Sequence, residues 1–109
     1  MSSPKTTIAY RDDYRPRHQV DPHVAVARER LARLEPGGSP RLPIDVASAS
    51  QIEVRALGTP CLRCDGPYRL DDHTAEVVDG QFVRVVSVHC GHCGAERVFY
   101  FRVVPRSVS

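Results

Sequence analysis

Residues 59–66 of the chain read TPCLRCDG and residues 88–95 read VHCGHCGA, and these two stretches decide the fold. Each stretch contains one C-x-x-C pair, and 25 residues separate the two pairs. Two pairs at this spacing are typical of a metal centre in which each pair forms a tight turn, or knuckle, and supplies two thiolates to one tetrahedral ion. The predicted ligands are all the cysteines of the chain: Cys61, Cys64, Cys90 and Cys93.

The ligand set favours zinc as the metal. Four thiolates complete a tetrahedral shell, which is the usual arrangement of structural zinc. An iron tetrathiolate is the alternative, because ligand type alone does not separate the two metals. Each knuckle also has a glycine near its second cysteine, where the backbone must turn so that its amide groups point at the sulfurs. We therefore expect one zinc ion held by the four cysteines.

Two other uses of paired cysteines fit the sequence less well. Disulfides are typical of secreted chains, but the first ten residues, MSSPKTTIAY, contain no apolar run of the kind that secretory leaders have. A redox pair of the thioredoxin type needs one motif at a strand-to-helix turn, whereas this chain has two matched pairs. Metal-binding thiolates need a reducing compartment, so we expect a cytoplasmic protein. No stretch has the length of a membrane span.

Length and charge narrow the choice of partner. The 109 residues predict one small domain with an extension, and a metal-binding part of about 45 residues is too small to fold without its ion. Residues 1–44 carry eight basic and five acidic side chains, and residues 45–109 carry seven basic and eight acidic ones. Four thiolates and one divalent ion change the second balance from −1 to −3. Because a domain that grips phosphate is expected to be basic, the charge favours a protein partner.

The first part of the chain is expected to hold a flexible tail at residues 1–20 and an amphipathic helix at residues 21–35. Asp21-Pro22 combines an acidic N-cap with proline at the first helical position, and Pro36-Gly37-Gly38 ends the helix. The helix carries an apolar stripe, which either covers one face of the chain's own sheet or lies in a groove of another protein. The stripe recurs at three- and four-residue steps and consists of Val24, Ala27, Leu31 and Leu34.

The second part of the chain is expected to be a linker at residues 36–50, a β domain at residues 51–104 and a tail at residues 105–109. Apolar and polar residues alternate from position 51 to 56, which predicts a half-buried strand before the first knuckle. Residues 68–78 and 81–89 flank Asp79-Gly80, a strong hairpin signal.

A last strand is predicted after the second knuckle, from Arg97 to Val104. Phe99, Phe101 and Val103 alternate along one face of it, and the opposite face is also apolar. This pattern predicts a central strand, or a strand with one face left for a partner.

The order of strand, knuckle, long hairpin, knuckle and strand resembles the zinc ribbons of the transcription machinery, in particular those of small polymerase subunits and of the transcript-cleavage elongation factor. The resemblance covers residues 51–104 and rests on the four cysteines and on HCGHCGAERVFYF at residues 89–101. It implies a small, mainly β, metal-stabilised fold of three to four antiparallel strands, to which this chain adds one N-terminal amphipathic helix. The elongation factor carries an acidic pair at its hairpin tip that assists catalysis. Here the tip, residues 78–81, reads VDGQ and has one acid.

We expect no enzyme and no small-molecule substrate. Four cysteines close the metal shell, and a closed shell cannot activate water. The other cluster of titratable groups is Asp71-Asp72-His73, in which Asp71 and His73 are expected to share one side of a strand. No nucleophile or phosphate-binding glycine loop accompanies them, so this cluster is interpreted as a solvated strand edge.

The expected function is that of a non-catalytic adaptor or accessory subunit that docks onto a larger cytoplasmic assembly. The resemblance implies the transcription or translation machinery as the host. The predicted contacts with a protein partner come from the helix and the last strand: Val24, Ala27, Leu31, Leu34, Phe99 and Phe101. The alternative is a ribbon that binds nucleic acid through Arg63, Arg69, Arg84, His92, Arg97 and Arg102.

Overall fold

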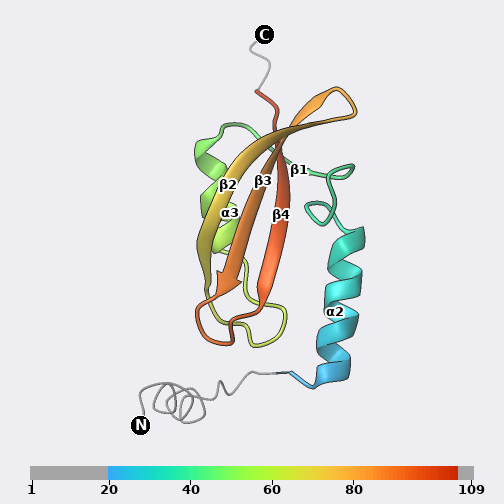
Figure 1. Cartoon of the computed structure of the whole chain (residues 1–109), viewed down its shortest axis with the longest axis vertical. Helices are drawn as coiled ribbons and strands as arrows, with labels where there is room; N and C mark the ends of the chain where they lie inside the picture. The colour runs from blue at the N-terminus through green and yellow to red at the C-terminus, as the bar shows by residue number, and fades with distance from the viewer. Residues whose placement is uncertain (1–19, 106–109) are drawn as a thin grey trace.

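A computed structural model describes residues 20–105, which form one four-stranded sheet and two helices (Figure 1). The tails expected at residues 1–20 and 105–109 therefore lie outside the described residues, apart from Val20 and Pro105. In chain order the elements are α2 (Pro22–Leu34), β1 (Ile44–Val46), α3 (Ser50–Leu57), β2 (Tyr68–Val78), β3 (Gln81–Cys90) and β4 (Glu96–Val103).

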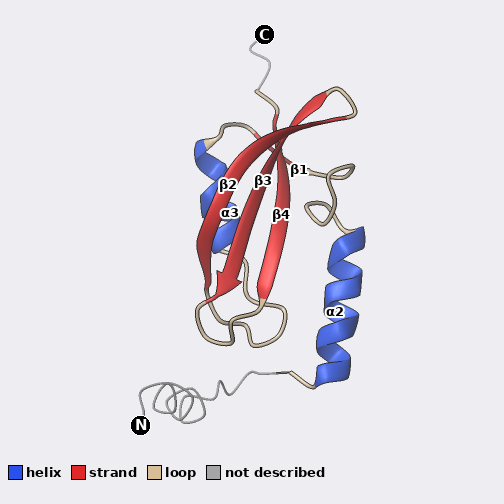
Figure 2. Cartoon of the chain, viewed as in Figure 1, coloured by secondary structure: helices blue, strands red, loops and turns tan. Residues whose placement is uncertain are grey.

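The strands follow the order β1-β4-β3-β2 across the sheet (Figure 2). β2 and β3 form a long antiparallel hairpin, and β4 lies antiparallel on the other side of β3. At the hairpin turn Asp79 and Gly80 have φ angles of 51° and 81°, which is the backbone that a two-residue turn between right-twisted strands requires. The hairpin predicted around Asp79-Gly80 is confirmed.

A short strand inside the predicted linker completes the sheet. Residues 44–46 form β1, which pairs parallel with the C-terminal half of β4, so the sheet is mixed rather than wholly antiparallel. Gly37 extends the contact, because its C=O accepts a hydrogen bond of 3.0 Å from the N–H of Tyr100. Three residues are too few to show an alternating pattern, and the strand carried no signal in the sequence.

The strand predicted at residues 51–56 is wrong, because this segment is the helix α3. Ile52 and Ala56, four positions apart, are both fully buried, whereas Val54 between them is 72% exposed. A strand would bury all three on one face, and only a helix separates the middle one from its neighbours. The segment SQIEVRAL is also rich in good helix formers, and a six-residue window satisfies both periodicities.

The core lies between α3 and one face of the sheet, where Figure 1 shows the helix against β2 and β3. The Tyr68 ring meets the edge of the Phe99 ring at a centroid distance of 5.9 Å and an angle of 79°. Three of the cysteines belong to the same buried cluster, so the knuckles continue the core. Its other members are Val46, Ile52, Ala56, Tyr68, Val86, Val88, Phe99 and Phe101.

Phe99 and Phe101 belong to this core and do not form a surface for a partner. Their side chains are 3% and 0% exposed. β4 lies between β1 and β3, and α3 packs against the face that carries both rings. The expectation of a central strand is confirmed, and the expectation that these two aromatic residues contact a partner is wrong.

The helix α2 begins where the sequence predicts. The Asp21 side chain accepts a hydrogen bond of 2.8 Å from the N–H of His23, and Pro22 occupies the first helical position. The helix ends at Leu34, and Gly37 then adopts a φ of 93° that favours glycine.

The apolar stripe of α2 faces away from the sheet. The buried residues of this helix are the small Ala25 and Ala32, and Figure 1 shows the helix standing beside β4. The expectation that the stripe covers the chain's own sheet is therefore wrong for residues 20–105, and the second expectation, a partner's groove, stays a prediction. The exposed fractions of the large stripe residues are 45% for Val24, 57% for Leu31 and 73% for Leu34, and Ala27 is exposed as well.

Truncating Ile52 and Val54 one at a time tests whether residues 50–57 are helical or extended. Ile52→Ala should lower the free energy of unfolding by about 2–5 kcal/mol, because it leaves a cavity against the sheet. Val54→Ala, the matched control, should change it by less than about 0.5 kcal/mol, because the side chain is exposed. Urea denaturation of the metal-loaded protein measures both. Equal losses for the two variants would indicate a strand and contradict the helix.

Candidate metal centre

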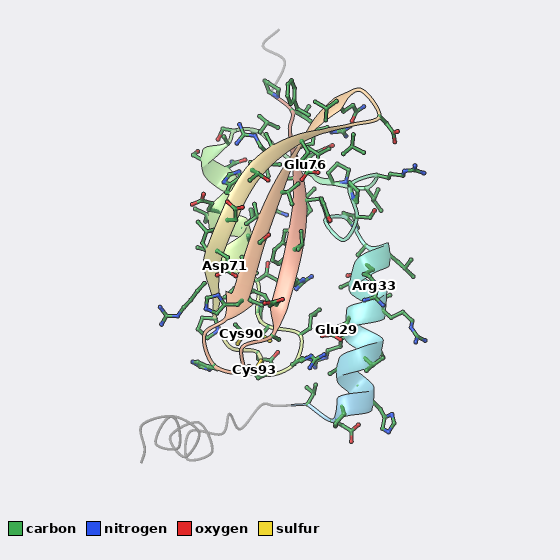
Figure 3. The ribbon with its side chains drawn as sticks, in the orientation of Figure 1. Glu29, Arg33, Asp71, Glu76, Cys90 and Cys93 are labelled. Carbon is green, nitrogen blue, oxygen red and sulfur yellow. The ribbon has the colours of Figure 1, made fainter. Side chains whose placement is uncertain are left out.

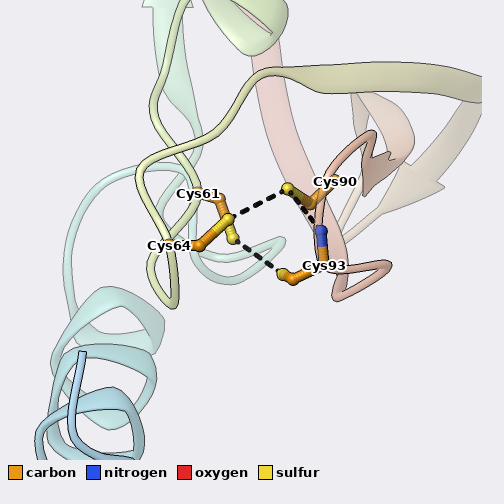
Figure 4. A group of neighbouring side chains, drawn as sticks. All are labelled: Cys61, Cys64, Cys90 and Cys93. Atoms are coloured by element: carbon orange, nitrogen blue, oxygen red, sulfur yellow. Dashed lines mark hydrogen bonds between the residues drawn. The ribbon is translucent and has the colours of Figure 1, made fainter. Parts of the chain in front are cut away.

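Four sulfur atoms gather at the end of the sheet where the two knuckles meet (Figure 4). The Sγ atoms of Cys61 and Cys93 are 3.6 Å apart, those of Cys64 and Cys90 are 3.4 Å apart, and all four lie within 4.8 Å of one another. A disulfide bond measures about 2.05 Å, so these are free thiols. Tetrahedral metal–sulfur bonds of about 2.3 Å place the sulfurs about 3.8 Å apart. The four cysteines therefore fit one ion between them.

Local hydrogen bonds shape the first knuckle. The N–H of Cys61 donates to the C=O of Gly66 (3.0 Å), and the N–H of Asp65 donates back to the C=O of Cys61 (2.9 Å). Asp65 has a φ of 61°, which aspartate tolerates better than most residues. A Cβ atom on Gly66 would lie 2.8 Å from Nδ1 of His92 and 3.1 Å from Sγ of Cys64, so glycine is needed here for close approach.

The second knuckle repeats the pattern of the first. The N–H of Cys90 donates to the C=O of Ala95 (2.8 Å), and the N–H of Gly94 donates to the C=O of Cys90 (3.0 Å). Gly94, like Asp65, has positive φ at the position after the second cysteine. A further bond of 2.8 Å from the N–H of Gly91 to the C=O of Pro67 ties the two knuckles together.

Backbone amides point at the sulfurs, as predicted from the glycines. The N–H of Arg63 lies 3.3 Å from Sγ of Cys61, and the N–H groups of His92 and Cys93 lie 3.3 Å and 3.4 Å from Sγ of Cys90. Hydrogen bonds of this kind stabilise a thiolate relative to a thiol. Both knuckles are thus built to carry negative charge on sulfur.

Burial and hydrogen bonding shift the pKa values of three of the four thiols. Burial raises the pKa of Cys64 far above its usual value, and burial also raises the pKa of Cys93. Burial acts in the same direction on Cys90, but hydrogen bonds from the N–H groups of Cys93 and His92 and from the Cys64 and Cys93 thiols together bring the pKa of Cys90 down to about 7. Four adjacent thiolates repel one another, and a divalent ion removes that cost.

With an ion bound, the four cysteines would form a closed metal shell. Three of its cysteines are at most 2% exposed, and Cys93 is half-buried. Four thiolates fill a tetrahedron and leave no position for water or substrate. The cluster can hold a metal ion, and this ligand set is typical of zinc.

The first knuckle also holds α2. Arg63 makes two hydrogen bonds to the Glu29 carboxylate, at 2.7 Å and 3.2 Å, and the pKa of Glu29 is lowered by the first of these contacts. Arg28 donates to the C=O of Leu62 (3.1 Å) and lies 3.6 Å from Asp65. Figure 3 shows Glu29 on the side of the helix that faces the knuckles. Sequence reasoning missed these contacts, because residues 34 positions apart leave no shared pattern.

The residues of the alternative nucleic-acid site do not form one basic surface. Arg63 pairs with Glu29, and Arg102 makes two hydrogen bonds to Asp45 on the opposite half of the sheet. Arg97 lies over the Phe99 ring at 4.3 Å. The remaining members lie at separate places: Arg84 contacts His73 (3.3 Å), Arg69 lies beside Gly91, and His92 lies in the second knuckle against Gly66.

Asp71 and His73 do not share one side of β2. An irregularity in the β2–β3 pairing between Leu70 and Asp72 shifts the alternation of faces. Asp71 then contacts His89 (2.7 Å), whereas His73 contacts Glu53 of α3 (2.8 Å). These two pairs point to opposite faces of the sheet, so the predicted arrangement of Asp71 with His73 is wrong.

Comparisons with protein-family models, with curated proteins and with solved structures found no match to this chain. Within residues 20–105, no helix has both the length and the apolar character needed to cross a membrane.

Loss of one ligand should unfold the knuckle end of the protein. Cys61→Ser removes a thiolate from a shell whose ion contributes on the order of 10 kcal/mol, which is comparable to the whole stability of a small domain. We expect loss of bound metal and of the strand signal in circular dichroism. Leu62→Ser, in the same knuckle but without a ligand atom, is the control and should keep both. A Cys61→Ser protein with an unchanged spectrum and a full metal content would contradict the assignment.

Metal affinity should rise with pH. Cys64 and Cys93 keep their protons at neutral pH, so the ion must displace both. For each proton displaced, the metal affinity should increase about tenfold for every unit by which the pH rises. Below about pH 7 Cys90 also becomes protonated, and the dependence should steepen there. Competition with a chromophoric chelator at about pH 6, 7 and 8, corrected for the chelator's own titration, measures this. An affinity that stays constant over this range would contradict thiolate ligation.

Proposed function

We propose that this protein is a non-catalytic zinc-ribbon adaptor, which presents a metal-ordered surface to a larger protein assembly. The observation that carries the proposal is the orientation of α2. Its charged inner side is fastened to the first knuckle, and its apolar stripe faces solvent. An apolar helix face that no part of residues 20–105 covers is typical of a docking surface.

Zinc is the metal that we propose for the cluster. The sulfur separations, the amide-to-sulfur hydrogen bonds and the four-thiolate set support it. The closed shell supports a structural role, because a catalytic site keeps one position open for water. Thiolate ligands are kept reduced in the cytoplasm, which is the compartment that we propose.

Metal binding and partner docking are coupled in this proposal. The ion orders the first knuckle, and that knuckle supplies Arg63, Asp65 and the C=O of Leu62 as the contacts that hold α2. Without the ion these three groups lose their common geometry, so the helix loses its support. A helix of 13 residues is marginal in water on its own. The ion therefore acts on the docking surface as well as on the core.

The proposed host is the transcription or translation machinery. The support is the resemblance of residues 51–104 to the zinc ribbons of transcription proteins in all but the first strand, whose place α3 takes, together with the knuckle–hairpin–knuckle–strand order of the fold. The scattered and paired arginines favour a protein partner over nucleic acid. The hairpin tip carries a single acid, so the proposal assigns it no catalytic assistance.

Placing negative charge on the apolar α2 stripe tests the docking surface. A Leu31→Asp/Leu34→Asp double variant should weaken binding of the partner by at least about tenfold, since each exposed leucine buries apolar area on docking. Tagged full-length protein is used to capture the assembly from cells of its own source, and mass spectrometry quantifies the bound proteins. Val54→Asp, an equally exposed apolar position on α3, is the control and should bind normally. An unchanged assembly on the double variant, with normal metal content, would contradict the proposed surface.

A further inference from the structure

A groove of about 490 Å³ lies between α2 and the outer edge of β4. Figure 3 shows Glu29 and Arg33 on the helix beside this strand. The groove differs from the apolar stripe of α2, which lies on the outer side of the same helix. Its walls come from α2, the first knuckle and β4, with Ala32, Arg33, Leu62, Arg97 and Val98 among the lining residues.

The floor of the groove is an open strand edge. β1 pairs with β4 only from Phe101 onward, and the N–H of Tyr100 bonds to the C=O of Gly37 on that same side. Alternate residues of a strand point their backbone groups to the same side, so the N–H and C=O of Val98 also point away from β3. Within residues 20–105 no backbone group bonds to Val98 on this side.

A second unsatisfied group lies in the same groove. The Arg97 guanidinium is held over two aromatic rings, 4.3 Å from the centre of Phe99 and 5.9 Å from that of Tyr68. Its Nη1 atom is buried and has no hydrogen-bond partner in the described part of the chain. The guanidinium already hydrogen-bonds the Tyr68 side chain, so Nη1 alone lacks an acceptor, and a carboxylate is the acceptor that matches its charge and geometry.

We propose that this groove binds an extended peptide segment of a partner protein, and that the segment carries an acidic side chain. The peptide adds as a strand beside β4, with its backbone paired to the N–H and C=O of Val98. Its carboxylate accepts hydrogen bonds from Arg97, and α2 forms the outer wall. A peptide fits this edge better than a phosphate backbone, because the C=O of Val98 needs a hydrogen-bond donor and a phosphate offers only acceptors.

This inference does not depend on the proposed docking of the α2 stripe. The two surfaces lie on opposite sides of one helix, so variants can test them separately. Leu31→Asp/Leu34→Asp alters the stripe and leaves the groove intact. Arg97→Met keeps packing against the two rings but removes every donor. Val98→Pro removes the outward N–H and leaves the pairing with β3 in place, as proline does on a free strand edge.

The experiment is a selection of random linear peptides, displayed on phage, against the full-length metal-loaded protein. We expect enriched peptides in which an aspartate or glutamate lies within a run of β-branched residues. Synthetic copies should bind the wild type and the Leu31→Asp/Leu34→Asp variant equally, and should bind Arg97→Met at least about tenfold more weakly. Val98→Pro should also lose binding. Failure to enrich any acidic sequence, or full binding to both groove variants, would overturn the proposal.

Amide hydrogen exchange gives a second test, which uses the wild-type protein and so does not depend on whether a variant folds. In the free wild-type protein the N–H of Val98 should exchange quickly, and the peptide should slow it at least about tenfold. The N–H of Phe99, which points toward β3, is the internal control and should be slow in both states. Slow exchange at Val98 without peptide would show that another part of this chain or a second copy occupies the edge, and would overturn the assignment to a partner.

Discussion

The rest of the structure depends on the approach of four cysteine sulfurs to within 4.8 Å of one another at one end of the sheet. Two knuckles that are distant in sequence meet there, and three of the cysteines are part of the buried core. Burial raises the pKa of the Cys64 and Cys93 thiols, so an ion held by thiolates would have to displace their protons. In the proposed function a metal shell supplements this small core.

The first knuckle also positions α2 on the surface, through charged and backbone contacts. Arg63 and the C=O of Leu62, both in the first knuckle, hold the inner side of α2, and this leaves an apolar stripe outside and a groove beside β4. In the proposed function a bound metal has two effects in one fold: it replaces apolar surface that a short chain lacks, and it positions a helix that has little packing of its own. Both candidate binding surfaces lie on this helix or next to it.

The sequence predicts the parts of this fold that depend on local chemistry. The knuckles, the turn at Asp79-Gly80, the cap at Asp21 and the central position of β4 all follow from residue type and spacing. The helix α3 was not predicted, because six alternating residues fit two periods and only packing decides between them. The exposure of Leu31 and Leu34, the burial of Phe101 and the Arg63–Glu29 contact depend on how distant segments pack, which a single sequence does not encode locally.

The ion itself is the most direct test of this account. Elemental analysis of the purified protein, combined with X-ray absorption at the metal edge, gives both the stoichiometry and the ligand set. The account predicts one zinc ion per chain with four sulfur neighbours at about 2.3 Å. A protein without stoichiometric metal, or an ion with nitrogen or oxygen in its first shell, would contradict the claim that the four cysteines form one closed site.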